Sequence, residues 1–297
     1  MDAKKLYLRA AVPPKKDGYR VSRLLKTEFR MTDGMIAALK WREGGILLEG
    51  MPVHTDAIAH AGQTLAARID DGEQGNAALP IPVPLPILYE DTYFAVLDKP
   101  AGMVVHGGEE NGPPTLANAL ASLWGPEQAF HPVHRLDRGT SGLLTVAKNA
   151  YVSERLRRQL HTEDFVRDYL ALVPGKMDPT RGAITLPIGP KEGERLRRCV
   201  RPDGQTARTD YETVEVFQNG SLLRLRLHTG RTHQIRVHLS ALGHPLLGDV
   251  FYGGEAAGLS RPALHAAFLT LRHPITGERL ELASPLPEDL AQIISHT

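Results

Sequence analysis

The sequence of 297 residues contains one cysteine, Cys199, so no disulfide bond can form within the chain. A single thiol is typical of proteins from a reducing compartment. The sequence also lacks any run of about 18 or more apolar residues, the length that a membrane-spanning helix needs. Its polar start has no apolar core of a secretion signal. We therefore expect a cytoplasmic protein with no membrane association.

Strong net charge is absent as well, because the formal charge at neutral pH is only +1. Hydrophobic residues make up 42% of the chain, which supports a packed core and argues against global disorder. The charge is unevenly distributed, since residues 151–236 hold more arginine and lysine than acid. Clustered arginines can contact phosphates, and they can also form a solvated protein surface. Composition leaves both interpretations open.

Common cofactor and metal motifs are missing too. There is no phosphate-binding Walker loop and no dinucleotide fingerprint, so no nucleotide cofactor is expected. His228, His233 and His238 match no usual zinc spacing, and we expect no metal. Ser141 lies in "GTSGL", which lacks the Gly-x-Ser-x-Gly pattern of a hydrolase nucleophile.

A proline-rich stretch, "ALPIPVPLPILYED" at residues 78–91, divides the chain. Alternating proline and apolar residues favour an extended backbone and exclude a helix. We predict an N-terminal domain over residues 1–78, a linker over 79–86 and a larger domain over 87–297.

The N-terminal segment has the pattern of two short helices followed by a β-hairpin. Val21, Leu24 and Leu25 have helical spacing, and so do Ile36 and Leu39. "ILLEGMPVHT" indicates a strand, a Glu-Gly turn and a second strand, and "GQTLAARI" a further strand. This order, with a core at about residues 17–71, resembles the S4 RNA-binding domain. A small structural cap without a ligand is the alternative.

The larger segment is rich in short apolar stretches that suit strands, such as "YFAVLDK", "GLLTVAK", "DYLALVPG" and "SLLRLRLH". In the last of these, Leu223 and Leu225 face one way while Arg224 and Arg226 face the other, which predicts a half-buried sheet with a basic face. Helices are expected to begin near Thr115, Val152 and Thr232. Because strands outnumber helices and do not alternate with them, we predict an α+β fold with a mixed, mostly antiparallel sheet.

One acid stands out in "HRLDRGTSGLLTVAK", where Asp137 lies between two arginines and precedes a glycine-containing loop and an apolar strand. Such loops often carry catalytic groups. In "LHTGRTHQIRVHLSALGHPLLGD", Arg231 stands where a strand passes into a helix, a position that can hold a phosphate or the Asp137 carboxylate. An arginine there would keep the carboxylate ionised. A structural salt bridge is the alternative for any single Asp.

These stretches together resemble the RluA-type family of pseudouridine synthases. "HRLDRGTSGL" resembles the family's catalytic motif, "LDKPAGMVVH" an upstream motif, and "DYLALVPG" its tyrosine-bearing strand. "TGRTHQIRVHLSALGHPLLGD" and "ALHAAFLTLRHPITGERLELASPLP" resemble its C-terminal motifs, and the motifs occur in family order over about residues 87–287. Two positions depart from the family pattern: Arg167 replaces a lysine, and Gly107 follows His106 where proline is common.

The resemblance implies an isomerase that converts uridine to pseudouridine in RNA without a metal or cofactor. It implies that Asp137 is the catalytic carboxylate, that Tyr169 stacks on the uracil and helps to move a proton, and that Arg231 pairs with Asp137. Arg135 would help to fill the gap left by an extruded nucleotide. His106, Thr140 and Gln234 are further candidates for contact with the substrate.

The RNA partner and the chemistry stay open at this point. An S4-like domain favours ribosomal RNA over transfer RNA, and we expect the protein to act as a monomer. Asp137 could add covalently to the sugar, or it could stabilise and deprotonate sugar intermediates. A non-catalytic RNA-binding protein on the same scaffold and a nucleoside or glycoside hydrolase are the rival functions.

Overall fold

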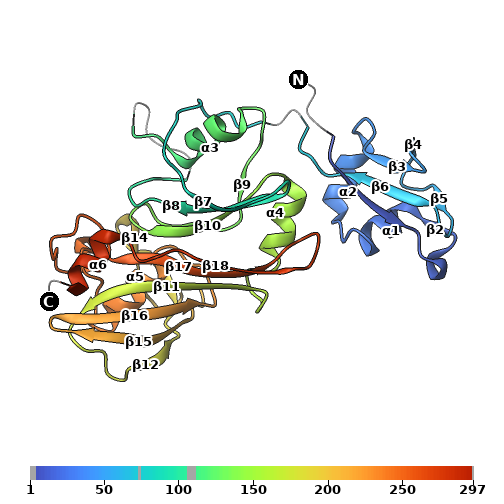
Figure 1. The fold of residues 1–297 in the computed structure, drawn as a ribbon. Helices are drawn as coiled ribbons and strands as arrows, with labels where there is room; N and C mark the ends of the chain where they lie inside the picture. Colours follow the sequence, from blue (N-terminus) through green and yellow to red (C-terminus); the bar gives the residue numbers. More distant parts are fainter. Residues whose placement is uncertain (1–4, 73–74, 106–111, 296–297) are drawn as a thin grey trace.

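A computed structural model of the chain describes residues 5–72, 75–105 and 112–295. Figure 1 shows a small N-terminal part, in blue, beside a larger part built around one extended sheet. In the small part, a four-stranded sheet has the order β1-β6-β3-β4, and a short pair of strands, β2 and β5, lies apart from it. The strands are β1 (Tyr7–Ala11), β2 (Tyr19–Arg20), β3 (Ile46–Leu48), β4 (Met51–Pro52), β5 (Ile58–Ala59) and β6 (Thr64–Arg68).

The helices of the small part form where the apolar spacing predicts them. Helix α1 (Val21–Thr27) buries Val21, Leu24 and Leu25, and α2 (Asp33–Lys40) buries Ile36 and Leu39. A one-turn helix, η1 (Pro14–Lys16), precedes them. The Thr32 side chain begins α2 by accepting a hydrogen bond from the Met35 backbone N–H. The two helices and the following hairpin are therefore as predicted, while the resemblance to an S4 domain stays a prediction.

The large part holds a ten-stranded sheet whose main path is β12-β15-β16-β11-β17-β10-β8-β7, with β18 added to β17 and β9 to β10. Strands β10 and β17 are parallel over a short stretch, and the other neighbours are antiparallel. The predicted α+β fold with a mixed, mostly antiparallel sheet is confirmed. The strands are β7 (Ile87–Glu90), β8 (Phe94–Lys99), β9 (His131–Pro132), β10 (Ser141–Ala147), β11 (Phe165–Pro174), β12 (Arg181–Ile184), β15 (Thr209–Phe217), β16 (Gly220–Leu227), β17 (Leu264–Arg272) and β18 (Arg279–Ala283).

Four helices, a one-turn helix and a two-stranded hairpin accompany this sheet. They are α3 (Leu116–Trp124), α4 (Ala150–Arg157), α5 (Gln234–Ala241), α6 (Glu288–Ser295), η2 (Val250–Tyr252) and the hairpin of β13 (Ile188–Lys191) and β14 (Glu194–Val200). Thr115 and Asn118 form a capping box at the start of α3, and Asn149 caps α4. In α5, Ile235 and Leu239 are buried, as their helical spacing predicts. Leu242 continues that spacing, but it follows the helix as its C-cap and is 42% exposed, and Val237 is buried instead.

The sheet separates a buried face from a charged one, as the alternation in β16 predicts. Leu223 and Leu225 are fully buried in the core that also contains Tyr169 of β11. On the opposite face, Arg224 and Arg226 both pair with the buried carboxylate of Asp168. Asp168 therefore faces the charged side of the sheet. Its neighbour Tyr169 faces the other side, which carries the site described below.

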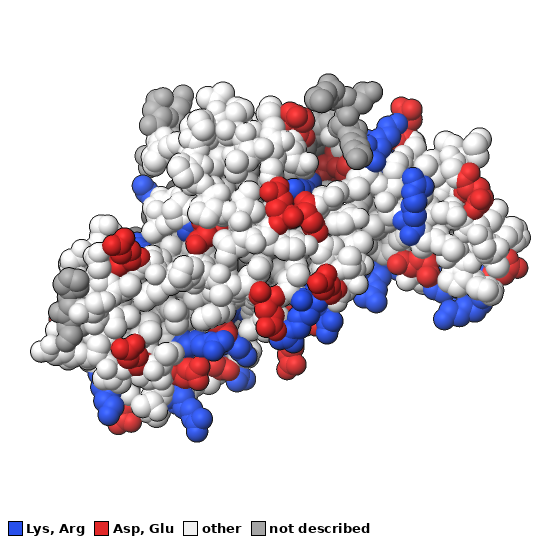
Figure 2. Space-filling model, in the orientation of Figure 1, with Lys and Arg blue, Asp and Glu red and all other residues white. Residues whose placement is uncertain are grey.

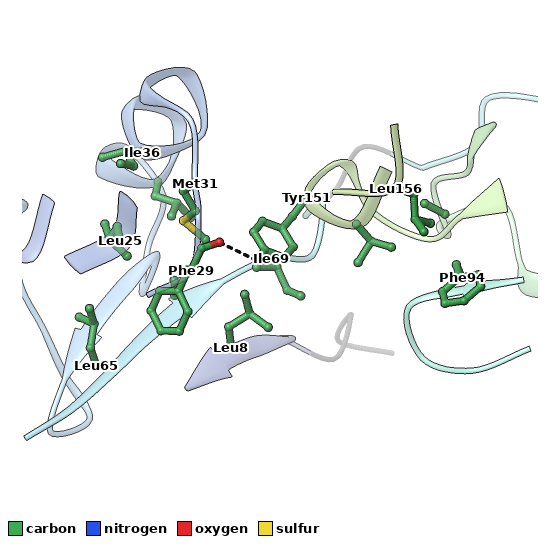
Figure 3. Close-up of a cluster of buried hydrophobic side chains, with 14 of the residues drawn as sticks. Leu8, Leu25, Phe29, Met31, Ile36, Leu65, Ile69, Phe94, Tyr151 and Leu156 are labelled. Carbon is green, nitrogen blue, oxygen red and sulfur yellow. Dashed lines mark hydrogen bonds between the residues drawn. The ribbon is translucent and has the colours of Figure 1, made fainter. Parts of the chain in front are cut away.

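One hydrophobic cluster joins the small and large parts of the chain. Figure 3 shows Phe29, Met31 and Ile69 of the small part beside Tyr151 of α4, whose hydroxyl donates a hydrogen bond of 2.7 Å to the Phe29 carbonyl. Asp71 adds polar contacts, because its carboxylate accepts from the Ala150 backbone N–H at 2.9 Å and lies 2.6 Å from the His131 ring. The two parts are therefore packed together and not merely tethered.

The proline-rich segment has no helix or strand over residues 79–86, as its composition predicts. It lies along α3, because the Ile81 N–H donates to the Asn118 carbonyl and the Asn118 amide donates to the Leu79 carbonyl. Val83 and Leu85 pack partly against the core of the large part. This segment is thus part of the packing around α3.

Charges of both signs are mixed on the visible surface in Figure 2, in agreement with the small net charge. None of the helices in the described part of the chain is long and apolar enough to cross a membrane. The same residues contain no group of three or more His, Cys, Asp or Glu side chains placed to hold a metal ion.

Candidate active site

A pocket on the buried side of the sheet gathers most of the predicted site residues. It is lined by residues 132–137, Thr140, Arg157, Arg167, Tyr169, Leu227, residues 230–236 and Leu264. The catalytic candidates Asp137, Tyr169 and Arg231 all lie on its wall, together with Arg135, Thr140 and Gln234. The remaining candidate, His106, falls outside the described residues.

The loop that carries Asp137 connects β9 to β10, and its shape depends on a glycine. Gly142 has a φ of +108°, and a Cβ at this position would lie 2.3 Å from the Ala266 carbonyl oxygen of β17. Gly142 and Ala266 are partners in the parallel pairing of β10 with β17, so only glycine allows this close approach. Within the loop, the Thr140 N–H donates to the Asp137 carbonyl at 3.1 Å. The Asp137 side chain is left 29% exposed to the pocket.

The buried ammonium group of Lys99 fixes the loop through backbone carbonyls. Lys99 is fully buried and donates to the carbonyls of Pro100 at 2.8 Å, Met103 at 3.0 Å and Arg138 at 3.4 Å. Burial lowers the pKa of Lys99 to about 8, and the negative charge of Asp137 opposes that shift. Lys99 therefore ties the upstream turn to the loop that carries the acid.

The charged partners of Asp137 differ from the sequence-based expectation. Its Oδ2 lies 3.8 Å from Nη1 of Arg236 and 4.0 Å from Nε2 of His233. Arg236 is itself held by the buried Asp249, through Nε–Oδ2 and Nη2–Oδ1 hydrogen bonds of 2.7 Å each. Arg236 lies in the first turn of α5.

Arg231, the predicted partner of Asp137, makes a different contact in this structure, and its pairing with the acid stays a prediction. Arg231 precedes α5, and its Nε donates to the Thr206 carbonyl at 3.0 Å. Among the described residues it makes no ion pair within 4.0 Å, although it lines the pocket. Both arginines belong to one motif, "TGRTHQIR", and nothing in their spacing shows which of them reaches the acid.

His233 links Asp137 to a second tyrosine that sequence analysis did not identify. His233 precedes α5 in a left-handed conformation, with a φ of 59°. Its Nδ1 lies 2.8 Å from the Tyr252 hydroxyl, and that oxygen accepts a hydrogen bond from the Arg198 backbone N–H. The Tyr252 hydrogen is then free to be donated to Nδ1, which places the imidazole proton on Nε2, facing Asp137. Burial lowers the pKa of His233, which favours this neutral form.

Tyr169 of β11 supplies the aromatic wall of the pocket and is only 4% exposed. Burial raises the pKa of its hydroxyl; the charge of Arg167 opposes that shift, and the smaller effect of Asp137 adds to it. The phenol therefore remains protonated at neutral pH and can act as a hydrogen-bond donor or a proton source.

Gln234, a predicted substrate contact, lines the pocket and is hydrogen-bonded within the protein. Its amide oxygen accepts from the Thr229 hydroxyl and the Arg231 N–H, and its NH₂ group donates to the Arg208 carbonyl and the Thr209 hydroxyl. These four bonds use the full hydrogen-bonding capacity of the amide. Gln234 fixes the turn that precedes α5.

Comparison with known proteins identifies the family of the chain. Residues 93–241 match the RNA pseudouridylate synthase family. The chain is 37% identical to "Ribosomal large subunit pseudouridine synthase D" of Xanthomonas campestris pv. campestris, over 97% of this chain and 91% of the relative. It is 35% identical to "Uncharacterized RNA pseudouridine synthase YhcT" of Bacillus subtilis, over 99% of this chain and 98% of the relative.

A solved structure points to the same fold. "Human RNA Pseudouridylate Synthase Domain Containing 1" superposes with a TM-score of 0.59 and 30% identity, covering 71% of this chain and 87% of the human protein. The matched family segment contains Asp137, Tyr169 and Arg236. By sequence over nearly its whole length and by fold, the chain belongs to the RNA pseudouridylate synthase family.

Proposed function

We propose that this protein isomerises specific uridines of large-subunit ribosomal RNA to pseudouridine, with Asp137 as its catalytic carboxylate. The observation that carries the proposal is the pocket itself. Asp137 is the one carboxylate on a described lining that holds five arginines, Arg135, Arg157, Arg167, Arg231 and Arg236. Such a lining favours a polyanionic substrate. The name of the Xanthomonas relative favours ribosomal RNA.

The residues of the pocket suit an isomerisation, in which the uracil leaves C1′ through N1 and rejoins it through C5. Asp137 acts on the ribose, either by covalent addition or by proton abstraction from a sugar intermediate. Nη1 of Arg236 and Nε2 of His233 lie 3.8 Å and 4.0 Å from its carboxylate, so both groups stand beside it without a direct hydrogen bond. Tyr169 stacks on the detached uracil and assists the proton transfer that ends the reaction.

The target base must leave the folded RNA before it can enter the pocket. Arg135 is exposed at the pocket wall and is placed to occupy the vacated position in the RNA. Thr140 is buried, lines the pocket with Asp137 and is our further candidate for contact with the substrate. We expect the protein to act as a monomer in the cytoplasm, with transfer RNA as the alternative substrate.

The test compares pseudouridine maps of ribosomal and transfer RNA from cells with the wild-type protein, without it, and with Asp137→Asn. Ribosomal sites that disappear in the last two samples would support the proposal. Sites lost only from transfer RNA would select the alternative. Purified Asp137→Asn that still isomerises RNA would remove Asp137 from the catalytic role, and free uracil in place of pseudouridine would indicate a hydrolase.

A further inference from the structure

Arg167 is a buried cation in the pocket with no visible counterpart. It lies on β11 two residues before Tyr169 and on the same face, and both side chains line the pocket. Arg167 is only 6% exposed, and its Nε is buried without a hydrogen-bond partner. Within the described ranges, its guanidinium makes no hydrogen bond and has no carboxylate within 4.0 Å.

The other arginines of the pocket are accounted for. Arg236 pairs with Asp249, Arg157 donates to the Pro132 carbonyl, and Arg231 donates to the Thr206 carbonyl. Arg135 is exposed to solvent. Asp168, although adjacent to Arg167, faces the other side of the sheet, where Arg224 and Arg226 hold it.

An uncompensated buried charge is costly, because the protein gives up hydration of the ion without gaining a partner. The surroundings of Arg167 offer only a weak substitute. Its guanidinium carbon lies 6.0 Å from the centre of the Phe165 ring, at the outer limit of a cation–π contact. The positive charge remains effective nearby, since burial and, after it, Arg167 lower the pKa of His134 to about 3. This cost is recovered if the natural ligand brings an anion to the site.

We propose that Arg167 binds a backbone phosphate of the RNA next to the uridine that enters the pocket, an inference that rests on the proposed function. A guanidinium presents two parallel N–H groups to phosphate oxygens, a geometry that an ammonium group cannot reproduce. Gly230 leaves space beside Nη1 of Arg167. A Cβ at this position would lie 3.7 Å from Nη1, in van der Waals contact with it. The inner face of β11 then presents Tyr169 to the base and Arg167 to the phosphate.

The test is a binding cycle on an RNA stem-loop that contains a mapped target uridine. Two further stem-loops carry a single uncharged methylphosphonate linkage, on the 5′ or the 3′ side of that uridine. All proteins carry Asp137→Asn, so that binding is measured without turnover. We compare this background with the same protein bearing Arg167→Gln, and with a control bearing Arg181→Gln, an exposed arginine of β12 outside the pocket.

We expect one of the two neutral linkages to weaken binding by the Arg167-containing protein about 10-fold or more, the range for a charge-assisted hydrogen bond. The same linkage should change the affinity of Arg167→Gln by less than about 2-fold, because the partner of the phosphate is already missing. Arg181→Gln should keep the full loss. Equal losses in all three proteins, for both linkages, would overturn the proposal.

A stability measurement shows whether the variant folds and tests the same idea. Without RNA, Arg167→Met should melt at the same temperature as the wild type or higher, because an unpaired buried charge has been removed. A clear fall in melting temperature would mean that Arg167 has a structural partner, which contradicts the proposal. Failure of this proposal can be told apart from failure of the proposed function. The wild type can form pseudouridine although the binding cycle shows no role for Arg167, and Arg167 can bind the phosphate although no pseudouridine is formed.

Discussion

Nη1 of Arg236 lies 3.8 Å from Oδ2 of Asp137, and the same guanidinium forms two 2.7 Å hydrogen bonds with the carboxylate of Asp249. Asp249 is 1% exposed, so this second pairing is deeply buried. The arginine beside Asp137 is thus itself fixed by another acid, which limits the directions in which its guanidinium can point.

Arg236→Gln should therefore slow isomerisation far more than Arg231→Gln. We expect a loss of about 10²- to 10³-fold in single-turnover rate at saturating RNA, as for other preorganised charged donors in active sites. For Arg231→Gln we expect less than about 10-fold. Rapid-quench measurement of pseudouridine formation gives both rates.

A buried Asp249 left without its partner could destabilise Arg236→Gln by about 3–5 kcal/mol and confuse the comparison. The control is Arg236→Gln combined with Asp249→Asn, which removes the orphaned charge. If this folded double variant regains the wild-type rate, or if Arg231→Gln is the slower single variant, the assignment of Arg236 is wrong.

The Tyr252 hydroxyl should matter for catalysis although it does not touch the pocket. Tyr252→Phe removes the donor to Nδ1 of His233, so the imidazole proton is no longer held on Nε2. We expect the single-turnover rate to fall by about 10-fold or more, since a wrong tautomer disables a histidine that depends on orientation. Nitrogen-15 NMR of the His233 ring should show a mixture of tautomers in place of the Nε2–H form.

The matched control is Tyr211→Phe, which removes a buried hydroxyl that makes only a long hydrogen bond of 3.4 Å to the Pro179 carbonyl. Its rate and the His233 spectrum should stay as in the wild type. An unchanged His233 spectrum in Tyr252→Phe would contradict the proposed hydrogen-bond direction.

His134 should make the fold sensitive to acid. Burial and the charge of Arg167 lower its pKa to about 3 in the folded chain, against 6.5 for an ordinary histidine. The unfolded chain therefore binds the proton first, so this contribution to stability is complete above pH 6.5 and is lost as the pH falls toward 3. At pH 5 the loss amounts to about 2 kcal/mol of unfolding free energy.

In the wild type, Nε2 of His134 accepts a hydrogen bond from the Thr145 N–H. His134→Gln offers an amide oxygen as the acceptor in its place, and the glutamine cannot be protonated in this pH range. Urea unfolding of both proteins at pH 7 and pH 5 should show a smaller loss for His134→Gln, by about 2 kcal/mol. Parallel pH dependence in the two proteins would mean that His134 does not titrate as the structure implies.

Local sequence signals were sufficient for most elements of the fold. The Leu/Arg alternation of β16, the apolar spacing of α1 and α2, and the capping residues Thr115 and Asn149 each act within a few residues. The order of the strands could not be predicted, because the parallel contact of Gly142 with Ala266 joins segments more than a hundred residues apart. Leu242 has the spacing of a buried residue but is exposed, because helical spacing in the sequence continues past the residue at which α5 ends.

In the candidate site, too, some features follow from local sequence and others depend on tertiary structure. Asp137 could be located because the glycines and the apolar strand around it define a loop anchored in the core. The choice between Arg231 and Arg236 depends on the buried Asp249 and on the start of α5, which are tertiary facts. The hydrogen bonds of Gln234 could not be predicted, because its four partners are spread over residues 208–231.

The N-terminal groove is expected to supply RNA affinity and not chemistry. Arg20, Arg23, Lys26 and Lys40 line it together with Asp33 and Asp56. Arg42, another basic residue of this part, does not line the groove and forms an ion pair with Asp70. Replacing Arg20, Arg23 and Lys40 together by glutamine should weaken binding to structured RNA and flatten its salt dependence by about two to three units of slope, since fewer counterions are released.

The saturating single-turnover rate should stay near that of the wild type, because these three residues do not line the pocket of Asp137. The control makes the same change in charge at three exposed arginines of the large part, Arg181, Arg272 and Arg279, none of which lines that pocket. Affinity is measured from low to high salt for all three proteins. If the groove variant and the wild type have the same slope, the N-terminal part acts as a structural cap. If the saturating rate collapses while the protein stays folded, the N-terminal part affects the reaction as well as RNA binding, and its contact with the large part through Tyr151 and Phe29 is the candidate route.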